Sequence, residues 1–341
     1  MKTPLKRLSL VSRLGGFAGP AAFQRRLEAG LQTRGIEVCY SLEDRPYDAV
    51  LVIGGTRRLN ALREVQQLGI PIFQRLNGMN WIHRRTRTGL RHFLKAEFSN
   101  MLLRTIRGHF ASGVIYQSAF AHGWWEQEYG RTPVPAAVIH NAVPLDQYTV
   151  EGTHDRPQDR QRILVVEGNL GGGYEAGLYA AFDLVDALRH QHNLRVELQI
   201  AGAASADLRT CWSGSAVPVE WLGPVLPEHV PELDRSAHLL YSSDINPACP
   251  NSVIEALACG LPVVAFNTGA LPELVPGSAG RLADYGTDPW KLEPPNISGL
   301  VSAAVEVLGN QDVFRAGARQ RALEAFSLDL MVDRYLEFLT A

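Results

Sequence analysis

The chain has 341 residues, a formal net charge of −2, 46% hydrophobic residues and 20% charged residues. The length predicts two domains, each able to bury its own core, and the composition is typical of a soluble globular protein. No window holds the roughly 18 to 20 unbroken apolar residues of a membrane-spanning helix, which excludes an integral helical membrane protein. The four cysteines show no paired metal-ligand spacing, so we predict no metal site and expect free thiols in a reducing cytoplasm; they are Cys39, Cys211, Cys249 and Cys259.

Residues 1–150 alternate between strand patterns and helix patterns. Apolar runs predict strands at residues 8–12, 36–40, 48–53, 70–75, 113–117 and 136–140. Helices are predicted at residues 21–33, up to 68, at about 86–110, and after Ser118, which is placed to cap the last of them. This alternation predicts a parallel sheet.

Residues 151–160 are polar and nonperiodic, and we interpret them as a linker. A second series follows, with strands predicted at residues 162–167, 196–202, 219–223, 238–242 and 261–266, and helices over 297–340 that break at 326–327. We therefore assign residues 1–150 to one doubly wound α/β domain and 151–327 to another, and expect the last helix, about 328–341, to pack back on the first. In such domains ligands bind outside the carboxyl ends of the strands, here in the cleft between the two domains.

The most informative segment is residues 249–273, which join a turn, a helix, a buried strand and a second glycine turn. Asn251 or Ser252 is placed to cap the helix, and Glu255 stands at the capping-box spacing from Ser252. Two helix N-termini follow two strand ends, and each offers N–H groups and a positive dipole end to an anion. We expect a ligand that carries phosphate; the alternative is that Ser252 and Glu255 only cap the helix.

Several segments together carry a family likeness. The most specific is residues 250–264, PNSVIEALACGLPVV, and the weaker ones are Gly15-Gly16 and residues 114–120, 138–143 and 200–202. With these segments the chain resembles glycosyltransferase family 4 over nearly its whole length. The resemblance implies the GT-B fold, two Rossmann-like domains facing a cleft, and a hexosyltransferase that moves a sugar from a nucleotide-sugar donor with retention at the anomeric carbon. It implies a donor on the second domain and a glycan or lipid-linked acceptor on the first, in cell-surface polysaccharide assembly.

The resemblance also implies which residues bind the donor. A Glu at the position of Glu255 holds the donor ribose, which suits a carboxylate that accepts from both hydroxyls of a diol. The backbone of residues 249–253 faces the diphosphate and the sugar. The full set of implied donor-binding residues is Gly15, Gly16, Gly168, Asn169, Gly172, Gly173, Asn246, Cys249, Pro250, Asn251, Ser252, Val253 and Glu255.

Two departures from the family pattern concern the sugar and the diphosphate. The acidic residue usual eight positions before Glu255 is Pro247 here, with Asp244 and Asn246 as the nearest polar residues. The usual Arg and Lys after the first strand of the second domain are absent from residues 167–177, EGNLGGGYEAG. We therefore expect the backbone amides of residues 171–173, together with Arg75, to neutralise the leaving diphosphate.

Residues 75–83, RLNGMNWIH, follow a strand end and bring together a cation, two amides and an imidazole. We predict Arg75, Asn77 and His83 as catalytic residues, with His83 hydrogen-bonding the donor sugar or the acceptor. The alternative is a tight turn at Asn77-Gly78 and a surface histidine. Because no DxD motif occurs, we expect no metal and no cofactor, and expect fixed N–H groups to stabilise the charge on the leaving phosphate.

The first 150 residues hold 20 Lys and Arg against 10 Asp and Glu, whereas the rest hold 13 against 25. Residues 84–107 form a basic amphipathic segment with seven Lys and Arg against one Glu, which predicts contact with an anionic membrane. The alternative is a solvated helix packed on its domain. Nucleic acid is not an expected partner, because the aromatic residues fall on the apolar face. We expect a cytoplasmic protein, peripheral on the inner face of the membrane if this segment binds lipid.

Three other activities stay open at the level of sequence. An inverting transferase and a nucleotide-sugar epimerase share the GT-B fold and are allowed by the two departures from the family pattern. A module that binds a nucleotide or a sugar without turnover has the same two-domain architecture. Release of nucleoside diphosphate from a nucleotide sugar separates a transferase from such a module.

Overall fold

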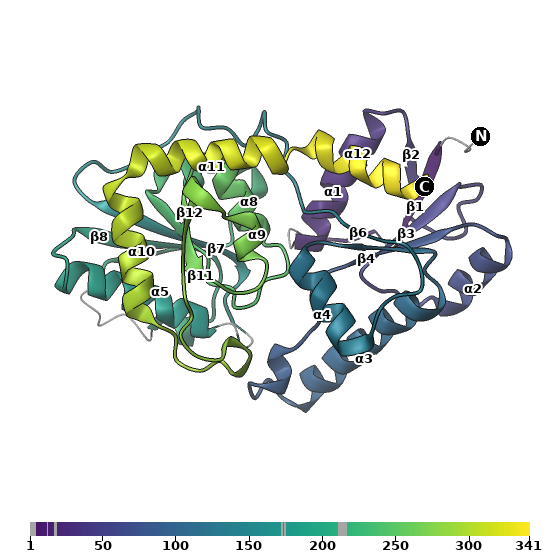
Figure 1. Ribbon diagram of the computed structural model, residues 1–341, viewed down its shortest axis with the longest axis horizontal. Helices are drawn as coiled ribbons and strands as arrows, with labels where there is room; N and C mark the ends of the chain where they lie inside the picture. The colour runs from purple at the N-terminus through teal and green to yellow at the C-terminus, as the bar shows by residue number, and fades with distance from the viewer. Residues whose placement is uncertain (1–4, 12, 17–18, 172, 174, 211–216) are drawn as a thin grey trace. The chain divides into compact units, whose positions relative to one another are not determined.

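The computed structural model describes residues 5–11, 13–16, 19–171, 173, 175–210 and 217–341, and the chain divides into two compact units. Unit 1 comprises Met1–Ala142 and Leu328–Ala341, and unit 2 comprises Val143–Ser327. The described strands form two parallel sheets of six strands, one in each unit (Figure 1). The α/β class and the two doubly wound sheets predicted from the sequence are therefore confirmed.

The sheet of unit 1 has the strand order β2-β1-β3-β4-β5-β6. Its strands are β1 (Arg7–Val11), β2 (Glu37–Cys39), β3 (Ala49–Ile53), β4 (Ile72–Leu76), β5 (Gly113–Tyr116) and β6 (Ala136–Val138). The helices are α1 (Gly19–Gln32), α2 (Leu59–Gln67), the 3-10 turn η1 (Ile82–Arg84), α3 (Leu90–His109), α4 (Ala119–Tyr129) and α12 (Leu328–Leu339).

Alternate residues of β3 show how unit 1 is layered. Leu51 and Ile53 pack with α1 and α12, whereas Val50 and Val52 pack with α2 and α3. All five residues of β3 are buried, as expected for a parallel strand covered on both faces. The C-terminal helix α12 lies directly on α1, where a Cβ on Gly30 would come within 2.4 Å of the Val332 side chain. A side chain larger than hydrogen at position 30 would therefore push α12 away.

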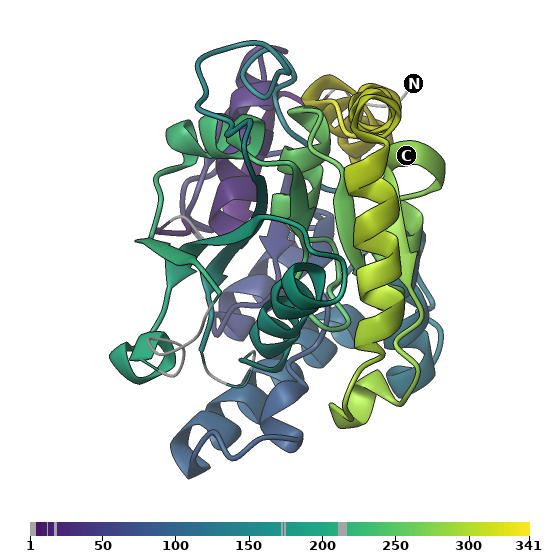
Figure 2. The same ribbon diagram turned by 90° about the vertical axis from the view of Figure 1, so that its left-hand side faces the viewer.

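The sheet of unit 2 has the order β12-β11-β10-β7-β8-β9. Its strands are β7 (Gln161–Asn169), β8 (Val196–Ala203), β9 (Val219–Gly223), β10 (Leu239–Tyr241), β11 (Val263–Phe266) and β12 (Gly280–Ala283). The longer helices are α5 (Glu175–His190), α7 (Val230–Ser236), α8 (Asn251–Ala258), α10 (Ile297–Gly309) and α11 (Gln311–Ala325), and the short elements are α6 (Ala206–Thr210), η2 (Pro227–His229), α9 (Leu271–Leu274), η3 (Gly277–Ala279) and η4 (Pro289–Lys291). Helices α5 and α10 lie side by side against the sheet, and α8 packs with α7 and α11 (Figure 2).

Unit 2 begins at Val143, whereas the sequence placed the boundary after residue 150. Hydrogen bonds to the main chain of residues 143–150 join this segment to unit 2. The Val143 N–H donates to Phe326 O at 3.0 Å, and Arg319 donates to Tyr148 O at 2.7 Å and to Leu145 O at 3.3 Å. The polar segment 151–160 therefore lies inside unit 2, after its first eight residues, and is not the boundary between the two units.

Helix ends differ from the sequence prediction where a single residue has a special conformation. The helix predicted from residue 86 begins at Leu90, because Gly89 has a φ of 87°, which a right-handed helix does not accept. Ser118 caps α4 as predicted, since its Oγ accepts from the Ala121 N–H at 3.0 Å. The break predicted at 326–327 is also present, between α11 and α12.

Candidate functional site

The carboxyl ends of β7 and β10 bound a cavity in unit 2. Neighbouring parallel strands end at the same edge, so the residues after β10 lie beside the end of β7. The cavity has a volume of about 160 Å³ and is lined by Glu167, Asn169, Leu170, Ser243 and Asp244. It occupies the edge of a doubly wound sheet at which ligands bind in this class of fold.

Two carboxyl groups, those of Glu167 and Asp244, line this cavity. Burial raises the pKa of Glu167 to about 8, and the nearby Asp244 adds to the shift. Burial also raises the pKa of Asp244 to about 7. Two adjacent carboxylates repel each other, so near neutral pH the pair retains a proton. A pair of this kind both donates and accepts hydrogen bonds, which suits a ligand with hydroxyl groups.

Glycines allow the surrounding main chain to approach this cavity closely. A Cβ on Gly177 in α5 would lie 1.7 Å from Ser243 O, and a Cβ on Gly202 in β8 would lie 2.2 Å from Glu167 O. Neither distance is possible for a real side chain. The positions of α5 and β8 against the edge of the sheet therefore depend on the absence of a side chain at these two residues.

The helix N-terminus at the same edge differs from the prediction. The expected caps, Asn251 and Ser252, are the first two helical residues, and Pro250 is the N-cap, with extended φ and ψ of −69° and 125°. Pro250 has no side chain that can form a cap hydrogen bond, and Ser252 is not at the N-cap position that a capping box requires, so the capping box predicted for Ser252 and Glu255 is wrong. The cause is Pro250, whose ring fixes the chain one residue earlier. The start of α8 carries the N–H groups and the positive dipole end of a helix, which bind anions.

Glu255 lies in the second turn of α8 and is 8% exposed. Asp234 of α7 is fully buried beside it; burial raises the pKa of Asp234 well above its ordinary value, and Glu255 raises it further. Its buried position therefore favours the protonated, uncharged form of Asp234 more than an exposed position would. Of the other implied residues in this segment, Cys249 and Val253 are buried and Pro250 is partly exposed.

The loop after β7 supplies fewer open N–H groups than the sequence suggested. The Gly171 N–H donates to Asn169 Oδ1 at 3.2 Å, and the Gly173 N–H donates to Glu175 Oε2 at 2.8 Å. Gly168 and Asn169 are exposed, and the predicted residue Gly172 lies outside the described residues. An incoming diphosphate would have to displace these two side chains to use the amides of Gly171 and Gly173.

Asn246 combines burial with an uncommon main-chain conformation. It has a φ of 58° and is 5% exposed, and its N–H donates to Thr268 Oγ1 at 3.4 Å. Its side-chain Nδ2 donates to no other residue in the described part of the chain. Pro247, which stands where the family has an acid, accepts from the Ala270 N–H through its carbonyl at 2.8 Å. Asn246 thus offers a donor that Pro247 does not.

The predicted catalytic residues of unit 1 fall into two groups. Arg75 in β4 is 1% exposed, and its guanidinium donates to Asn77 Oδ1 at 3.0 Å and to Asn141 Oδ1 at 2.6 Å. It also stacks on the Phe23 ring, with 3.6 Å between the guanidinium carbon and the ring centroid. The structure therefore brings Arg75 and Asn77 together, at the carboxyl end of β4.

His83 is bound into a separate network. Its Nε2 lies 2.8 Å from Glu97 Oε1, and its ring packs edge-on against Phe93 with centroids 5.1 Å apart. Arg84 pairs with the same carboxylate and, as the main cause, lowers the pKa of Glu97 to about 2. His83 is 5% exposed, so the alternative of a surface histidine is wrong. Its contacts attach η1 to α3.

Gly15 and Gly16 follow β1, as the sequence indicated. Both are exposed, and a Cβ at either position would meet no atom of the described residues within 4 Å. Gly16 has a φ of 80°, and its carbonyl accepts from Arg25 Nη1 at 2.6 Å. The turn therefore leaves open space in unit 1 where a ligand can approach the main chain.

Sequence reasoning missed Glu167 as a site residue and named Asp244 only as a substitute for an absent acid. The available signal was that Glu167 lies at the carboxyl end of one apolar strand run and Asp244 follows another, and these two strands, β7 and β10, are neighbours in the sheet. Among the described residues no cluster of three potential metal ligands is present, and no helix is long and apolar enough to cross a membrane. Cys39, Cys249 and Cys259 are buried free thiols, whereas Cys211 is outside the described residues.

Comparison with known proteins links this edge to a family. Residues 161–310 match the family model described as "Glycosyl transferases group 1". A curated relative, D-inositol 3-phosphate glycosyltransferase from Geodermatophilus obscurus, is 29% identical over 231 residues, which cover 62% of this chain and 49% of the relative. The chain thus spans about half the length of the curated relative it matches. The family match includes α8 and the whole cavity-lining set.

Solved structures resemble the chain over almost its full length. Sucrose-phosphate synthase from Thermosynechococcus elongatus has a TM-score of 0.74 at 14% identity, with 98% of each chain covered. HepE from Anabaena, in complex with UDP and glucose, has a TM-score of 0.71 at 17% identity, covering 98% of this chain and 99% of HepE. WaaG, a glycosyltransferase involved in lipopolysaccharide biosynthesis, has a TM-score of 0.70 at 13% identity, covering 98% and 100%. At these identities the likeness shows the fold.

Proposed function

We propose that this chain, whose residues 161–310 match the group 1 glycosyltransferase family model and which has the GT-B fold, is a glycosyltransferase that transfers a sugar from a nucleotide-sugar donor bound at the carboxyl edge of unit 2. The observation that carries the proposal is the N-terminus of α8, which begins after Pro250 at the carboxyl edge of the sheet and has Glu255 in its second turn. Its N–H groups and dipole suit a diphosphate, and the Glu255 carboxylate suits a ribose diol.

The mechanism follows from where charge develops. As the bond between the sugar and the phosphate breaks, negative charge grows on the leaving diphosphate, and N–H groups fixed at the start of α8 are already oriented to stabilise it. In a retaining reaction the departing phosphate receives the acceptor proton, so no protein base is needed. We infer retention and independence of metal ions on this basis. Product analysis by NMR of the anomeric proton, with EDTA present, checks both inferences.

A thermal-shift screen against UDP-, GDP- and ADP-sugars tests donor binding, and UDP-sugars come first because HepE was crystallised with UDP and glucose. A ligand at 100 times its Kd stabilises a protein by about 2.7 kcal/mol. Glu255→Ala should abolish the shift. Glu232→Ala, which removes the same charge from an exposed position of α7, should keep it. If the nucleotide sugar raises the melting temperature of Glu255→Ala as much as that of the wild type, Glu255 does not bind the ribose.

We propose that Glu167 and Asp244 together recognise the sugar. They would take the role of the acidic residue that the family has at the position of Pro247. Both line the cavity at the strand ends, and a pair that shares a proton can bond sugar hydroxyls without placing two full charges beside a diphosphate. Glu167→Gln keeps the shape and most of the hydrogen bonds and should raise KM for the donor severalfold. Glu167→Leu should raise it further, and equal KM values for all three proteins would contradict the assignment.

The role of Arg75 in neutralising the diphosphate is a proposal of the same kind. Arg75 is held by two asparagine oxygens and a phenyl ring, so its charge is fixed in position at the end of β4. Arg75→Lys retains a charge without the bidentate fork. Both Arg75→Lys and Arg75→Ala should lower kcat/KM, the latter more. An Arg75→Ala protein that folds, as judged by circular dichroism, and turns over normally would exclude the role.

We further propose that the acceptor is a lipid-linked glycan and that α3 rests on an anionic membrane. Large apolar side chains are exposed on α3, among them Leu90 at 75%, Leu94 at 59% and Met101 at 51%. Basic residues lie on or just before the same helix: Arg84, Arg85, Arg87, Arg91 and Lys95. Exposed apolar residues beside cations fit an anionic lipid surface better than solvent. A role in surface-glycan assembly on the cytoplasmic side would follow, by analogy with WaaG.

Liposome co-sedimentation tests this surface. The wild type should bind vesicles that contain phosphatidylglycerol and release them at high salt, and Leu90→Ser combined with Leu94→Ser should bind less. Leu226→Ser and Val313→Ser, made together, remove two exposed apolar side chains of unit 2 and serve as the matched control. Equal binding by the two double variants would contradict a role for α3.

A binding module without turnover is the competing function, and one observation favours it. The loop after β7 has no Arg or Lys, and the amides of Gly171 and Gly173 are already bonded to side chains. Slow release of nucleoside diphosphate from one nucleotide sugar indicates a transferase. Tight binding of that donor with no release, with every acceptor tried, indicates the module.

A further inference from the structure

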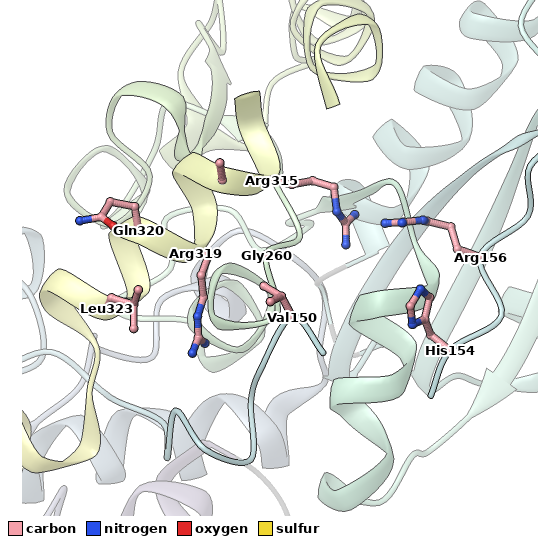
Figure 3. Close-up of a pocket in the computed structure, with 9 residues that line it drawn as sticks. Val150, His154, Arg156, Gly260, Arg315, Arg319, Gln320 and Leu323 are labelled. Atoms are coloured by element: carbon pink, nitrogen blue, oxygen red, sulfur yellow. The ribbon is translucent and has the colours of Figure 1, made fainter. Parts of the chain in front are cut away.

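A second cavity in unit 2 lies at the opposite edge of the sheet. It has a volume of about 350 Å³, and its wall includes Val150, Arg156, Gly260, Arg315 and Arg319 (Figure 3). Gly260 precedes β11, and Arg315 donates to the carbonyl of Ala237, which precedes β10, at 3.2 Å. The cavity is therefore at the amino ends of the strands, whereas the proposed donor site is at their carboxyl ends.

Three guanidinium groups line this cavity, and in the described part of the chain none of them forms an ion pair with a carboxylate. Arg315 and Arg156 point toward each other (Figure 3). Burial, and next the charge of Arg156, lowers the pKa of Arg315 to about 10. Like charges placed together in a partly buried site are unfavourable unless an anion lies between them.

The cations are also pre-positioned. Arg319 donates to three main-chain carbonyls, of Tyr148, Ala258 and Leu145, at 2.7, 2.6 and 3.3 Å. Arg315 is anchored through one nitrogen to Ala237. The side chain of Arg156 makes no hydrogen bond or ion pair with any described residue, so it can move to meet a ligand. Two fixed cations and one mobile cation form a clamp for an anion.

We propose that this cavity binds the phosphate group of a small phosphomonoester, at a site separate from that of the donor. Guanidinium groups match the geometry of phosphate oxygens in bidentate pairs. The remaining wall combines the apolar side chains of Val150, Ala316 and Leu323 with His154 and Gln320, which suits a compact organic moiety that carries both apolar and hydroxyl groups beside the phosphate. The volume of about 350 Å³ exceeds that needed for a bare phosphate ion and is within the range of small-molecule pockets.

Titration calorimetry of the full chain with glycerol 3-phosphate, at constant ionic strength, tests the site. Arg156→Gln should weaken the Kd at least about tenfold. Arg160→Gln removes the same charge four residues away, from an exposed arginine paired with Asp159 and Glu197, and should leave the Kd within about twofold. Arg315→Gln should also weaken binding, but it breaks a main-chain bond, so Arg156 is the deciding position. The donor-site variant Glu255→Ala should bind glycerol 3-phosphate as the wild type does.

The phosphate group can belong to a soluble metabolite or to a lipid headgroup, and two arms separate these sources. Binding of glycerol 3-phosphate that is lost in Arg156→Gln supports a soluble ligand. Binding only to phosphatidylcholine vesicles that contain phosphatidic acid, lost in the same variant, supports a lipid headgroup. An Arg156→Gln protein that binds both probes as the wild type does overturns the proposal, and so does a wild type that binds neither. These outcomes do not depend on whether the chain transfers a sugar.

Discussion

Acid should weaken unit 2 through a single histidine, His238. The residue precedes β10, is 9% exposed, and its Nδ1 accepts from the Arg162 N–H at 2.9 Å. Burial lowers the pKa of His238 to about 4 from 6.5, and the neighbouring cations Arg156, Arg315 and Arg162 lower it further. The hydrogen bond requires an unprotonated Nδ1, so the neutral ring is built into the fold.

The sign and size of the effect follow from linkage. Between the folded pKa of about 4 and the unfolded value of 6.5, the unfolded chain binds more protons, so the free energy of unfolding falls as the pH falls. His238 therefore contributes stability that is fully present above pH 6.5 and is lost as the pH falls through about 4. One pKa unit corresponds to about 1.4 kcal/mol, so the loss between pH 7 and pH 4.5 is about 2 kcal/mol.

Hydrogen exchange of peptides from β7 and β10 in rising urea, followed by mass spectrometry, measures the free energy of unfolding of unit 2 itself. His238→Asn keeps an acceptor for the Arg162 N–H and removes the titration. Its unfolding free energy should fall by about 2 kcal/mol less than that of the wild type between pH 7 and pH 4.5. His192→Asn, at an exposed position, should follow the wild type. If His238→Asn shows the same acid dependence as the wild type, the reasoning is refuted.

Three further substitutions probe the packing and charge of the two units. In the wild type, donor affinity should fall as the pH rises from about 7 to 9, because the pair Glu167 and Asp244 loses its remaining proton and then carries two charges. Calorimetry of Glu167→Gln should show a smaller change, and parallel profiles would contradict this. Gly177→Ala should lower the unfolding free energy, measured by urea titration, by about 1–3 kcal/mol and should weaken donor binding, because its Cβ would meet Ser243 O. Gly123→Ala, which has open space around its Cβ, should change neither quantity. Arg107→Met cuts buried hydrogen bonds to β5 and to the loop after α4, and should cost unit 1 about 1–3 kcal/mol; an unchanged urea midpoint would contradict that account.

Periodicity and turn residues were enough to predict most of the strands. In a parallel sheet covered on both faces each strand is a short apolar run, and β3, β10 and β11 have that pattern. The segment 250–264 likewise predicted a helix and a buried strand at a ligand edge. Short elements such as β12 and α7 were not predicted, because a few residues carry little periodicity.

Candidate side chains were harder to interpret from sequence than elements. Ser252 and Glu255 have the spacing of a capping box, but Pro250 takes the cap position, and spacing alone does not report main-chain dihedral angles. His83 was predicted to reach a ligand or solvent, and it is buried against Glu97, fourteen residues further along the chain. Only for His83 was the partner decided by the packing of another element, α3.

The sequence by itself determined the class of fold and the edge at which a donor is expected, because the order of strands, glycine turns and helix starts is local information. Tertiary structure decided which charges meet. Glu167 and Asp244 come together only because β7 and β10 pair, and Arg156, Gly260 and Arg315 enclose one cavity only because α8 and α11 pack at the amino edge of that sheet. Burial and proximity between residues far apart in sequence set these interactions, and no local pattern encodes them.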